Sequence, residues 1–219
     1  MKLTPKCCEK SKPLDQIQLL SLTKKTIEYY DREARNFWQG TQDHDVSQNY
    51  KAFLEAIKSD LPNTILDLGC GPGRDLLYFK SKGHNATGLD GAREFVTMAR
   101  LISNCQVLHQ DFLTMKLPQS HFDGVFANAS LFHVPSQELP QVLTKIFSTL
   151  KPNGIFFCSN PRGSNEEGYR DERYCCFFEP QTWCDFVKTA GFTHVQQYFR
   201  PPGVPRHQQP WLATVWRKI

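Results

Sequence analysis

The sequence predicts an α/β fold in which helices cover both faces of a seven-stranded, mostly parallel sheet. Short apolar runs alternate with amphipathic segments from residue 64 to residue 190, a glycine-rich turn follows the first run, and two β-like segments end the chain. Strands that alternate with helices imply parallel neighbours with right-handed crossovers, whereas two strands joined by a Pro- and Gly-containing connection form an antiparallel pair. We therefore predict a Rossmann-like, doubly wound fold.

Composition and charge narrow the class of protein. The 219 residues, 40% of them hydrophobic, suffice for one sizeable globular domain. No apolar run reaches the length of a membrane helix, and the N-terminus lacks the pattern of a secretory signal, so we expect a soluble, cytoplasmic protein without membrane partners. The net charge is only +4 and the basic residues are dispersed, which argues against a nucleic-acid partner.

The eight cysteines show no spacing that is typical of a metal site. They form two adjacent pairs and four scattered positions, and none makes a CxxC motif. We expect reduced thiols and no structural metal.

Two helices are expected before the first strand. Residues 23–39 place Ile27, Tyr30 and Ala34 at helical spacing, and Gly40 ends that helix. A second helix is expected over 47–59, with Ser47 as its N-cap. The predicted division of the chain is a flexible N-terminal segment, 1–22, and one domain, 23–219, made of a helical cap, 23–60, and a Rossmann-like core, 61–219.

The core elements follow from apolar periodicity and flanking turn residues. The run TILDLG is typical of a buried parallel strand that enters a turn. A long loop rich in Gly, Asn and Arg is expected between residue 160 and the helix at 180–190. Loops longer than about 12 residues are typically functional lids or disordered segments. The expected strands are 64–69, 85–90, 105–111, 122–128, 154–160, 193–200 and 211–218, and the expected helices are 74–82, 92–103, 136–150 and 180–190.

The turn DLGCGPG, residues 67–73, is the strongest single signal for a ligand site. Glycines between a buried strand and a helix let the backbone pass close to a ligand, where a β-carbon would collide. The spacing differs from the dinucleotide pattern GxGxxG, and Pro72 stands where a helix that binds pyrophosphate needs free N–H groups. The turn therefore favours a cofactor without phosphate.

Acidic residues stand at the ends of the next two predicted strands. Asp90 is placed to accept both hydroxyls of a ribose, and Gly91 follows it. Asp111 and Phe112 suit an adenine ring, because a carboxylate can accept from the amino group while the phenyl ring covers the base. An Asp at a strand end can equally form a turn or a cap, but successive strand-end acids favour a shared site.

The segments ILDLGCGPGRD, GLD, QDF, FDGVFAN and LKPNG resemble the successive motifs of class I S-adenosylmethionine-dependent methyltransferases. The resemblance implies a transferase that converts S-adenosyl-L-methionine into S-adenosyl-L-homocysteine. Arg74 either neutralises the cofactor carboxylate or faces solvent. The cofactor-binding residues that the resemblance implies are Asp67, Gly69, Gly71, Gly73, Asp90, Asp111 and Phe112.

Candidate acceptor residues follow the fourth and fifth predicted strands. Asn128 is expected to border the cofactor, and His133 is either a general base or a packed loop histidine. One of the arginines in the loop after residue 160 is expected to hold a substrate carboxylate. The acceptor-binding candidates in these two segments are Ser130, Phe132, Asn160, Arg162, Tyr169 and Arg173.

A second, more specific family resemblance indicates which molecule accepts the methyl group. The segments FWQGTQDHDVSQN, FDGVFANASLFHVPSQELP, SNPRGSNEEGY and RPPGVPRHQQPWLATVWRK resemble the C-terminal methyltransferase domain of ovothiol (5-thiohistidine) synthases. The resemblance implies N-methylation of the imidazole Nπ of 5-thiohistidine, giving ovothiol A. In those bifunctional enzymes a sulfoxide synthase inserts the sulfur, so we expect this chain to depend on a separate sulfoxide synthase.

The polar segment 42–49 is the candidate acceptor pocket. Alkylation of one imidazole nitrogen requires the proton on the other nitrogen to be held or removed, which suits a carboxylate or a histidine. The alternative is that the two aspartates cap the second helix and the histidine is solvated. The catalytic candidates are Asp43, His44 and Asp45; the binding candidates are Ser47, Gln48, Asn49 and, near the C-terminus, Gln209; Tyr30 and Trp38 are candidates for covering the cofactor and acceptor.

Two other functions remain open. The same cofactor site can serve another small thiol, imidazole or quinone-like acceptor. A non-catalytic S-adenosylmethionine-binding protein is the third possibility, against which the complete set of cofactor motifs and the polar segment ahead of them stand.

Overall fold

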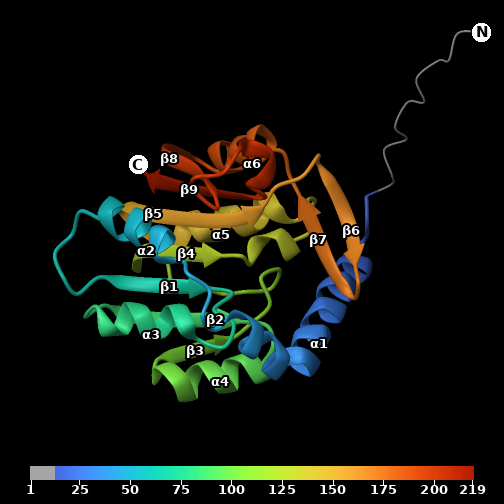
Figure 1. Ribbon diagram of the computed structural model, residues 1–219, viewed down its shortest axis with the longest axis horizontal. Helices are drawn as coiled ribbons and strands as arrows, with labels where there is room; N and C mark the ends of the chain where they lie inside the picture. The colour runs from blue at the N-terminus through green and yellow to red at the C-terminus, as the bar shows by residue number, and fades with distance from the viewer. Residues whose placement is uncertain (1–12) are drawn as a thin grey trace, which may run out of the picture.

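The computed structural model describes residues 13–219. Its larger sheet has seven strands in the order β3-β2-β1-β4-β5-β9-β8 (Figure 1). The first five of these are parallel, and β9 runs antiparallel to both β5 and β8. The sheet elements are β1 (Thr64–Leu68), β2 (Asn85–Asp90), β3 (Gln106–His109), β4 (Phe122–Asn128), β5 (Leu150–Pro161), β8 (Phe192–Arg200) and β9 (Trp211–Lys218). This topology confirms the predicted fold class.

Helices cover both faces of the sheet. Alternation along the strands sends Ile65 to the side packed by Phe53 and Phe79, and Leu66 to the side packed by Leu143. The helical elements are α1 (Gln16–Thr41), α2 (Ser47–Ala56), α3 (Arg74–Ser81), α4 (Arg93–Ser103), α5 (Leu139–Thr149) and α6 (Pro180–Thr189), with short 3-10 turns η1 (Leu131–His133) and η2 (Arg206–Gln208).

Helix α1 is longer than the sequence predicted. It starts at Gln16 rather than residue 23 and continues to Thr41, so Gly40 lies inside it. Asp15 begins the helix, because its carboxylate accepts from the Gln18 N–H while the Gln18 side chain accepts from the Asp15 N–H. The predicted flexible segment 1–22 therefore overlaps α1, and its residues 1–12 lie outside the described part of the chain.

The start of α2 also differs from prediction. Ser47 is the first helical residue and not the N-cap; Val46 occupies the N-cap position. The Asp45 carboxylate accepts a hydrogen bond of 2.9 Å from the Ser47 N–H, so one predicted acceptor residue also supports the helix start.

The predicted loop after residue 160 contains a β-hairpin. Strands β6 (Glu166–Arg170) and β7 (Arg173–Phe177) form a separate two-stranded antiparallel sheet. The hairpin packs against α1: the Tyr174 N–H donates to Thr26 Oγ1 over 2.9 Å, and the Arg32 guanidinium pairs with Glu172. Figure 1 shows α1 and this hairpin together at the end of the sheet where β1 and β4 terminate. They form one wall around the carboxyl ends of the parallel strands.

Candidate active site

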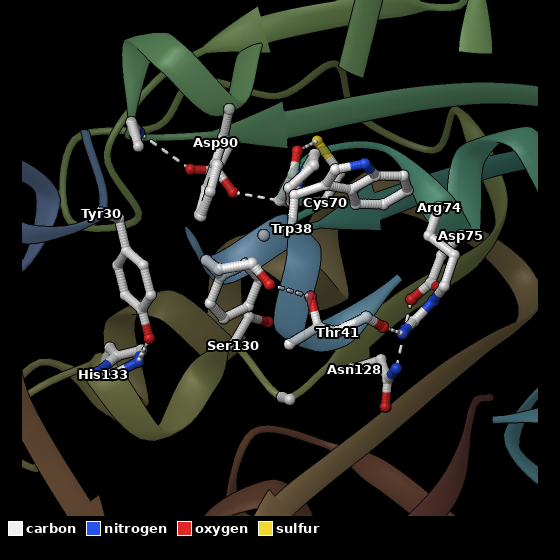
Figure 2. A pocket seen from close by; sticks show the side chains of 18 of the residues that line it. Tyr30, Trp38, Thr41, Cys70, Arg74, Asp75, Asp90, Asn128, Ser130 and His133 are labelled. Atoms are coloured by element: carbon white, nitrogen blue, oxygen red, sulfur yellow. Dashed lines mark hydrogen bonds and ion pairs between the residues drawn. The ribbon is translucent and has the colours of Figure 1, made fainter. Parts of the chain in front are cut away.

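A cavity of about 720 Å³ lies at the carboxyl ends of β1, β2 and β4 (Figure 2). Its size falls in the range of small-molecule sites. Helix α1 covers one side, the glycine turn and the loops after β2, β3 and β4 form the floor, and the segment before α2 with the end of β8 forms the far side. The predicted site residues on its lining are Tyr30, Trp38, His44, Asp45, Gly69, Gly71, Arg74, Asp90, Gly91, Asp111, Phe112, Asn128, Ser130 and His133.

The glycine turn is shaped by close backbone approach. Gly69 has a φ of +78°, and a β-carbon there would collide with the side chain of Ser130 and lie 3.1 Å from Phe112 Cζ. The Ser130 hydroxyl donates to the Leu68 carbonyl over 2.6 Å, which ties the loop after β4 to the end of β1. Glycine at position 69 therefore lets the loop after β4 pack directly on the turn, which lines the cavity through Gly69 and Gly71.

Asp90 ends β2, as predicted, and faces the cavity. Its two carboxylate oxygens accept from the N–H groups of Gly71 and Ala92, each over 2.9 Å (Figure 2). Since each oxygen has a second acceptor position, the carboxylate can still accept two hydroxyl donors. Burial raises the pKa of Asp90 to about 6.

This pKa predicts pH-dependent nucleoside binding. Hydroxyl donors favour the charged carboxylate, so ribose affinity is expected to fall by up to about tenfold per pH unit as the pH drops below 6. Titration calorimetry between pH 5 and pH 7 with 5′-methylthioadenosine, which has no amino-acid charges, measures the effect. The variant Asp90→Asn should show a flat profile over that range; an equally sloped profile in the variant would assign the titration to another group.

The predicted adenine pair lies beyond its strand rather than within it. Strand β3 ends at His109, and the Asp111 carboxylate accepts from the Leu113 N–H over 2.8 Å, which stabilises the following turn. Phe112 and Phe95 provide apolar lining on this side of the cavity. The side chains can still flank a flat ring, although the predicted strand boundary at residue 111 is wrong.

A polar network connects α3 to the cap and to β4. The Arg74 guanidinium donates to Asp75 Oδ1 over 2.7 Å and to the carbonyl of Thr41 over 3.0 Å. The Tyr50 hydroxyl donates to the same Asp75 oxygen over 2.5 Å, and the Asn128 amide donates to the other over 3.2 Å. Asp75 thus already neutralises the charge of Arg74, and Arg74 holds the end of α1 against α3. Asp75 also lines the cavity, although it was not predicted as a site residue.

Two other predicted residues lie behind the lining. Asn49 donates to Asn128 Oδ1 over 2.9 Å and accepts from the Tyr198 hydroxyl, so it orients Asn128 rather than bordering the cavity. Asp67 is 1% exposed and does not line the cavity, and its Oδ2 has no hydrogen-bond partner. Burial, with the neighbouring Asp75 charge, raises the pKa of Asp67 well above its usual range.

His133 is held as a neutral ring. Its Nδ1 lies 2.7 Å from the carbonyl oxygen of Tyr174, which only accepts, so Nδ1 carries the proton. Nε2 therefore accepts from the Tyr30 hydroxyl over 2.8 Å (Figure 2). Burial lowers the pKa of His133 to about 4 and raises the pKa of Tyr30 to about 12. The predicted base thus has its lone pair engaged by Tyr30.

Tyr30→Phe tests this contact. The change leaves the buried Nε2 of His133 without its donor, and we expect the free energy of unfolding to fall by about 1–3 kcal/mol. Urea denaturation measures it. Tyr29→Phe is the matched control, because the Tyr29 ring packs edge-on against Tyr30, and we expect a change of no more than about 0.5 kcal/mol. Equal losses in both variants would mean that the hydroxyl–imidazole bond contributes nothing measurable.

Only part of the polar segment 42–49, which precedes and begins α2, lines the cavity. His44 and Asp45 line the cavity, whereas Asp43, Ser47 and Gln48 do not. Arg200 Nη2 donates to the Asp45 carbonyl over 2.7 Å, which fixes this segment to the end of β8.

The remaining acceptor candidates lie outside the lining, since their side chains contact neighbouring structure instead. Phe132 packs on His133 at a ring-centroid distance of 4.0 Å, and buried Asn160 lies on β5. Arg162 donates to the carbonyls of Gln209 and Arg206. The other candidates outside the lining are Tyr169, on β6; Arg173, over the Tyr29 ring; and Gln209, whose amide donates to the Pro201 carbonyl.

Other lining residues were not predicted as site residues. Phe37 lies on the apolar stripe of α1, which sequence periodicity alone cannot distinguish from core packing. Arg200 and Pro201 reach the cavity because β8 ends beside the segment before α2. Trp211, by contrast, belongs with Gln209 to the segment that the ovothiol-synthase resemblance favoured for the site, and it lines the same side at the start of β9.

Within residues 13–219, no helix has the length and apolar character to cross a membrane. The same residues contain no cluster of three or more His, Cys, Asp or Glu side chains arranged to hold a metal ion.

Comparisons with known proteins agree with this fold. Residues 65–154 match the family described as "Methyltransferase domain". The chain is 27% identical over 176 residues to phosphoethanolamine N-methyltransferase 1 of Zea mays, covering 75% of this chain and 35% of that protein. It is 32% identical over 119 residues to trans-aconitate 2-methyltransferase of Enterobacter sp. (strain 638), covering 53% of this chain and 46% of that protein. The chain thus spans less than half the length of these curated relatives.

Among solved structures, 1,6-didemethyltoxoflavin-N1-methyltransferase of Burkholderia thailandensis superposes with a TM-score of 0.77 at 20% identity, covering 95% of this chain and 92% of that one. The methyltransferase of Leishmania major gives a TM-score of 0.75 at 17% identity, covering 89% of this chain and 82% of that one. At these identities the likeness establishes the fold. The chain therefore has the fold of S-adenosylmethionine-dependent methyltransferases, and its residues 65–154 match a methyltransferase domain.

Proposed function

We propose that the chain is an N-methyltransferase that transfers a methyl group from S-adenosylmethionine to the Nπ atom of 5-thiohistidine, giving ovothiol A. One observation supports methyl transfer most strongly: a single cavity borders Asp90 and the glycine turn as well as His44 and Asp45. The choice of acceptor rests on the sequence segments that resemble ovothiol synthases.

The residues on the floor of the cavity fit the cofactor. Gly69 lets the backbone turn with a positive φ at the cavity floor, and the Asp90 carboxylate has acceptor positions for two ribose hydroxyls. Phe112 and Phe95 are placed to flank the adenine ring. When bound, the sulfonium supplies an electrophilic methyl group, and the protein's task is to hold the acceptor in line with it.

The far side of the cavity fits an imidazole acceptor. Trp38 and Trp211 offer flat apolar surfaces, and His44 and Asp45 offer polar atoms beside them. In the proposed reaction the Nπ lone pair forms the new N–C bond as the C–S bond breaks. His44 or Asp45 holds the proton on the other ring nitrogen, which keeps the Nπ lone pair available. Orientation of the two reactants can contribute several of the roughly 7–11 kcal/mol attainable from this effect.

His133 has a positioning role in this proposal. Its Nε2 accepts from Tyr30 and its Nδ1 donates to the Tyr174 carbonyl, so it orients the Tyr30 hydroxyl on the cofactor side of α1. A lowered pKa also makes the ring a weak base near neutral pH.

The names of the relatives support a small-molecule acceptor. They are named for phosphoethanolamine, sterols and trans-aconitate. The alternative within this class is another thiol, imidazole or quinone-like metabolite in the same cavity. We further propose a cytoplasmic location and functional dependence on a separate sulfoxide synthase, which must supply the thiolated imidazole.

The test measures both the turnover of the acceptor and the position of the transferred methyl group. The purified chain is incubated with S-adenosylmethionine and 5-thiohistidine, or with a panel of related imidazoles and thiols. Mass spectrometry follows methyl transfer, and NMR locates the methyl group. We expect methylation at Nπ of 5-thiohistidine. Cofactor binding without methylation of 5-thiohistidine would refute the proposed acceptor, and methylation at sulfur would refute the proposed regiochemistry.

A further inference from the structure

Arg200, the last residue of β8, reaches the far side of the cavity. One nitrogen of its guanidinium, Nη2, donates to the Asp45 carbonyl over 2.7 Å. Its Nε is buried and has no hydrogen-bond partner. A buried donor without an acceptor is costly, so an acceptor atom that reached Nε would be bound favourably.

The charge of Arg200 is also uncompensated by an ion pair. Arg74, the other cationic arginine of the lining, pairs with Asp75 at 2.7 Å. Among residues 13–219, no carboxylate lies within 4.0 Å of the Arg200 guanidinium. The nearby Asp45 carboxylate accepts from the Ser47 N–H instead. Arg200 is therefore available for an external anion.

The surroundings of Arg200 define the shape of such a site. Arg200 is paired with Trp211 across β8 and β9, so the two side chains lie on the same face of the sheet. Both line the cavity together with His44 and Asp45. This end of the cavity thus combines a cation, a flat indole and a carboxylate. It lies beside β8 and β9, away from Asp90 at the end of β2 and from Phe112 after β3.

We propose that Arg200 binds the carboxylate of the acceptor, and that the acceptor is an amino acid. Guanidinium nitrogens match a carboxylate, and Nε supplies one donor of the usual fork. The Asp45 carboxylate provides the opposite charge for the ammonium group of the same molecule. Arg162 and Arg173, which the sequence analysis favoured for this task, lie outside the cavity lining. The assignment rests on the proposed function for its choice of 5-thiohistidine as a probe.

The experiment compares two ligands that differ only in the carboxylate. The full chain, saturated with S-adenosylhomocysteine, is titrated by calorimetry with 5-thiohistidine and with its decarboxylated counterpart, 5-thiohistamine. We expect the wild type to bind 5-thiohistidine more tightly by on the order of 10- to 100-fold, the usual effect of a charge-assisted hydrogen bond. Arg200→Gln should abolish this preference, which is a ratio of two affinities and so is independent of any shared loss from the broken contact to the Asp45 carbonyl, and Arg200→Lys should restore it in part.

The control is Arg35→Gln, because Arg35 is exposed on α1 and lies outside the cavity lining. It should keep the full preference, and circular dichroism checks that each variant is folded. A preference that persists in Arg200→Gln, or its absence in the wild type, overturns the assignment. Binding with the expected preference but without methyl transfer refutes the proposed reaction and upholds the anion site.

If the wild type binds neither probe, the proposed acceptor fails. The anion site is then judged by the same titration with imidazole-4-propanoate against 4-ethylimidazole. A preference for the acid that Arg200→Gln removes upholds the site, and equal binding overturns it.

Discussion

Either Asp45→Asn or His44→Asn, whichever removes the group that holds the ring proton, is expected to lower kcat/KM for methylation of 5-thiohistidine by on the order of 100-fold, the lower range for a positioned acid or base. Both side chains line the cavity, and the proposed reaction requires one of them to hold the ring proton. Asparagine is as good a helix cap as aspartate, so Asp45→Asn removes the charge while the Ser47 N–H keeps an acceptor. Steady-state kinetics with a mass-spectrometric assay measures the loss.

The dissociation constant of S-adenosylhomocysteine separates this effect from a structural one. It should change by less than about twofold in both variants, because the cofactor residues lie across the cavity. Asp43→Asn is the adjacent comparison, since Asp43 lies outside the lining, and its kcat/KM should stay near that of the wild type. Equal losses of turnover and cofactor affinity would instead identify segment 42–49 as structural.

Asp90→Ala is expected to weaken S-adenosylhomocysteine binding by on the order of 100- to 1,000-fold. Two hydroxyl bonds to a buried carboxylate contribute about 1.5–3 kcal/mol each, and part of that is offset because removal of the charge also removes its desolvation cost. The variant also frees the N–H groups of Gly71 and Ala92, so its stability is measured in parallel by urea denaturation.

The contribution of the ribose contact is isolated by measuring two ligands, with and without the ribose hydroxyls, in both the wild type and Asp90→Ala. The wild type should lose as much affinity for the 2′,3′-dideoxy analogue as Asp90→Ala loses for the parent nucleoside, and the variant should hardly distinguish the two ligands. If Asp90→Ala still prefers the parent by the full wild-type factor, the ribose lies elsewhere.

The parallel part of the sheet was predictable because each strand is a short apolar run with turn residues at its end. The run 64–69 and the acid at Asp90 fall where expected, and so does the antiparallel order of the last two strands. The glycine turn was recognisable for a physical reason, since a β-carbon at Gly69 would collide with the loop after β4. Local spacing was therefore enough to predict the fold and several residues that line the cavity.

The acceptor side depends on contacts between segments far apart in the chain, which no local pattern encodes. Hairpin β6–β7 forms where the sequence indicated a loop, because it packs against α1 through contacts such as Tyr174 to Thr26. For the same reason the lining arginine on the proposed acceptor side is Arg200, placed by the end of β8, and not Arg162. Helix α1 also carries cavity residues such as Phe37 on a stripe that resembles an ordinary core face.

We expect one cavity to hold the cofactor and an amino-acid acceptor with their reacting atoms in line. A crystal structure of the chain with S-adenosylhomocysteine and 5-thiohistidine tests it most directly. We expect the ribose hydroxyls at Asp90 and the acceptor carboxylate at Arg200. The imidazole Nπ should face the cofactor sulfur, with room for a methyl group about 3–3.5 Å from the nitrogen before transfer. An acceptor bound outside this cavity, or a ring whose Nπ faces away from the sulfur, would contradict the account.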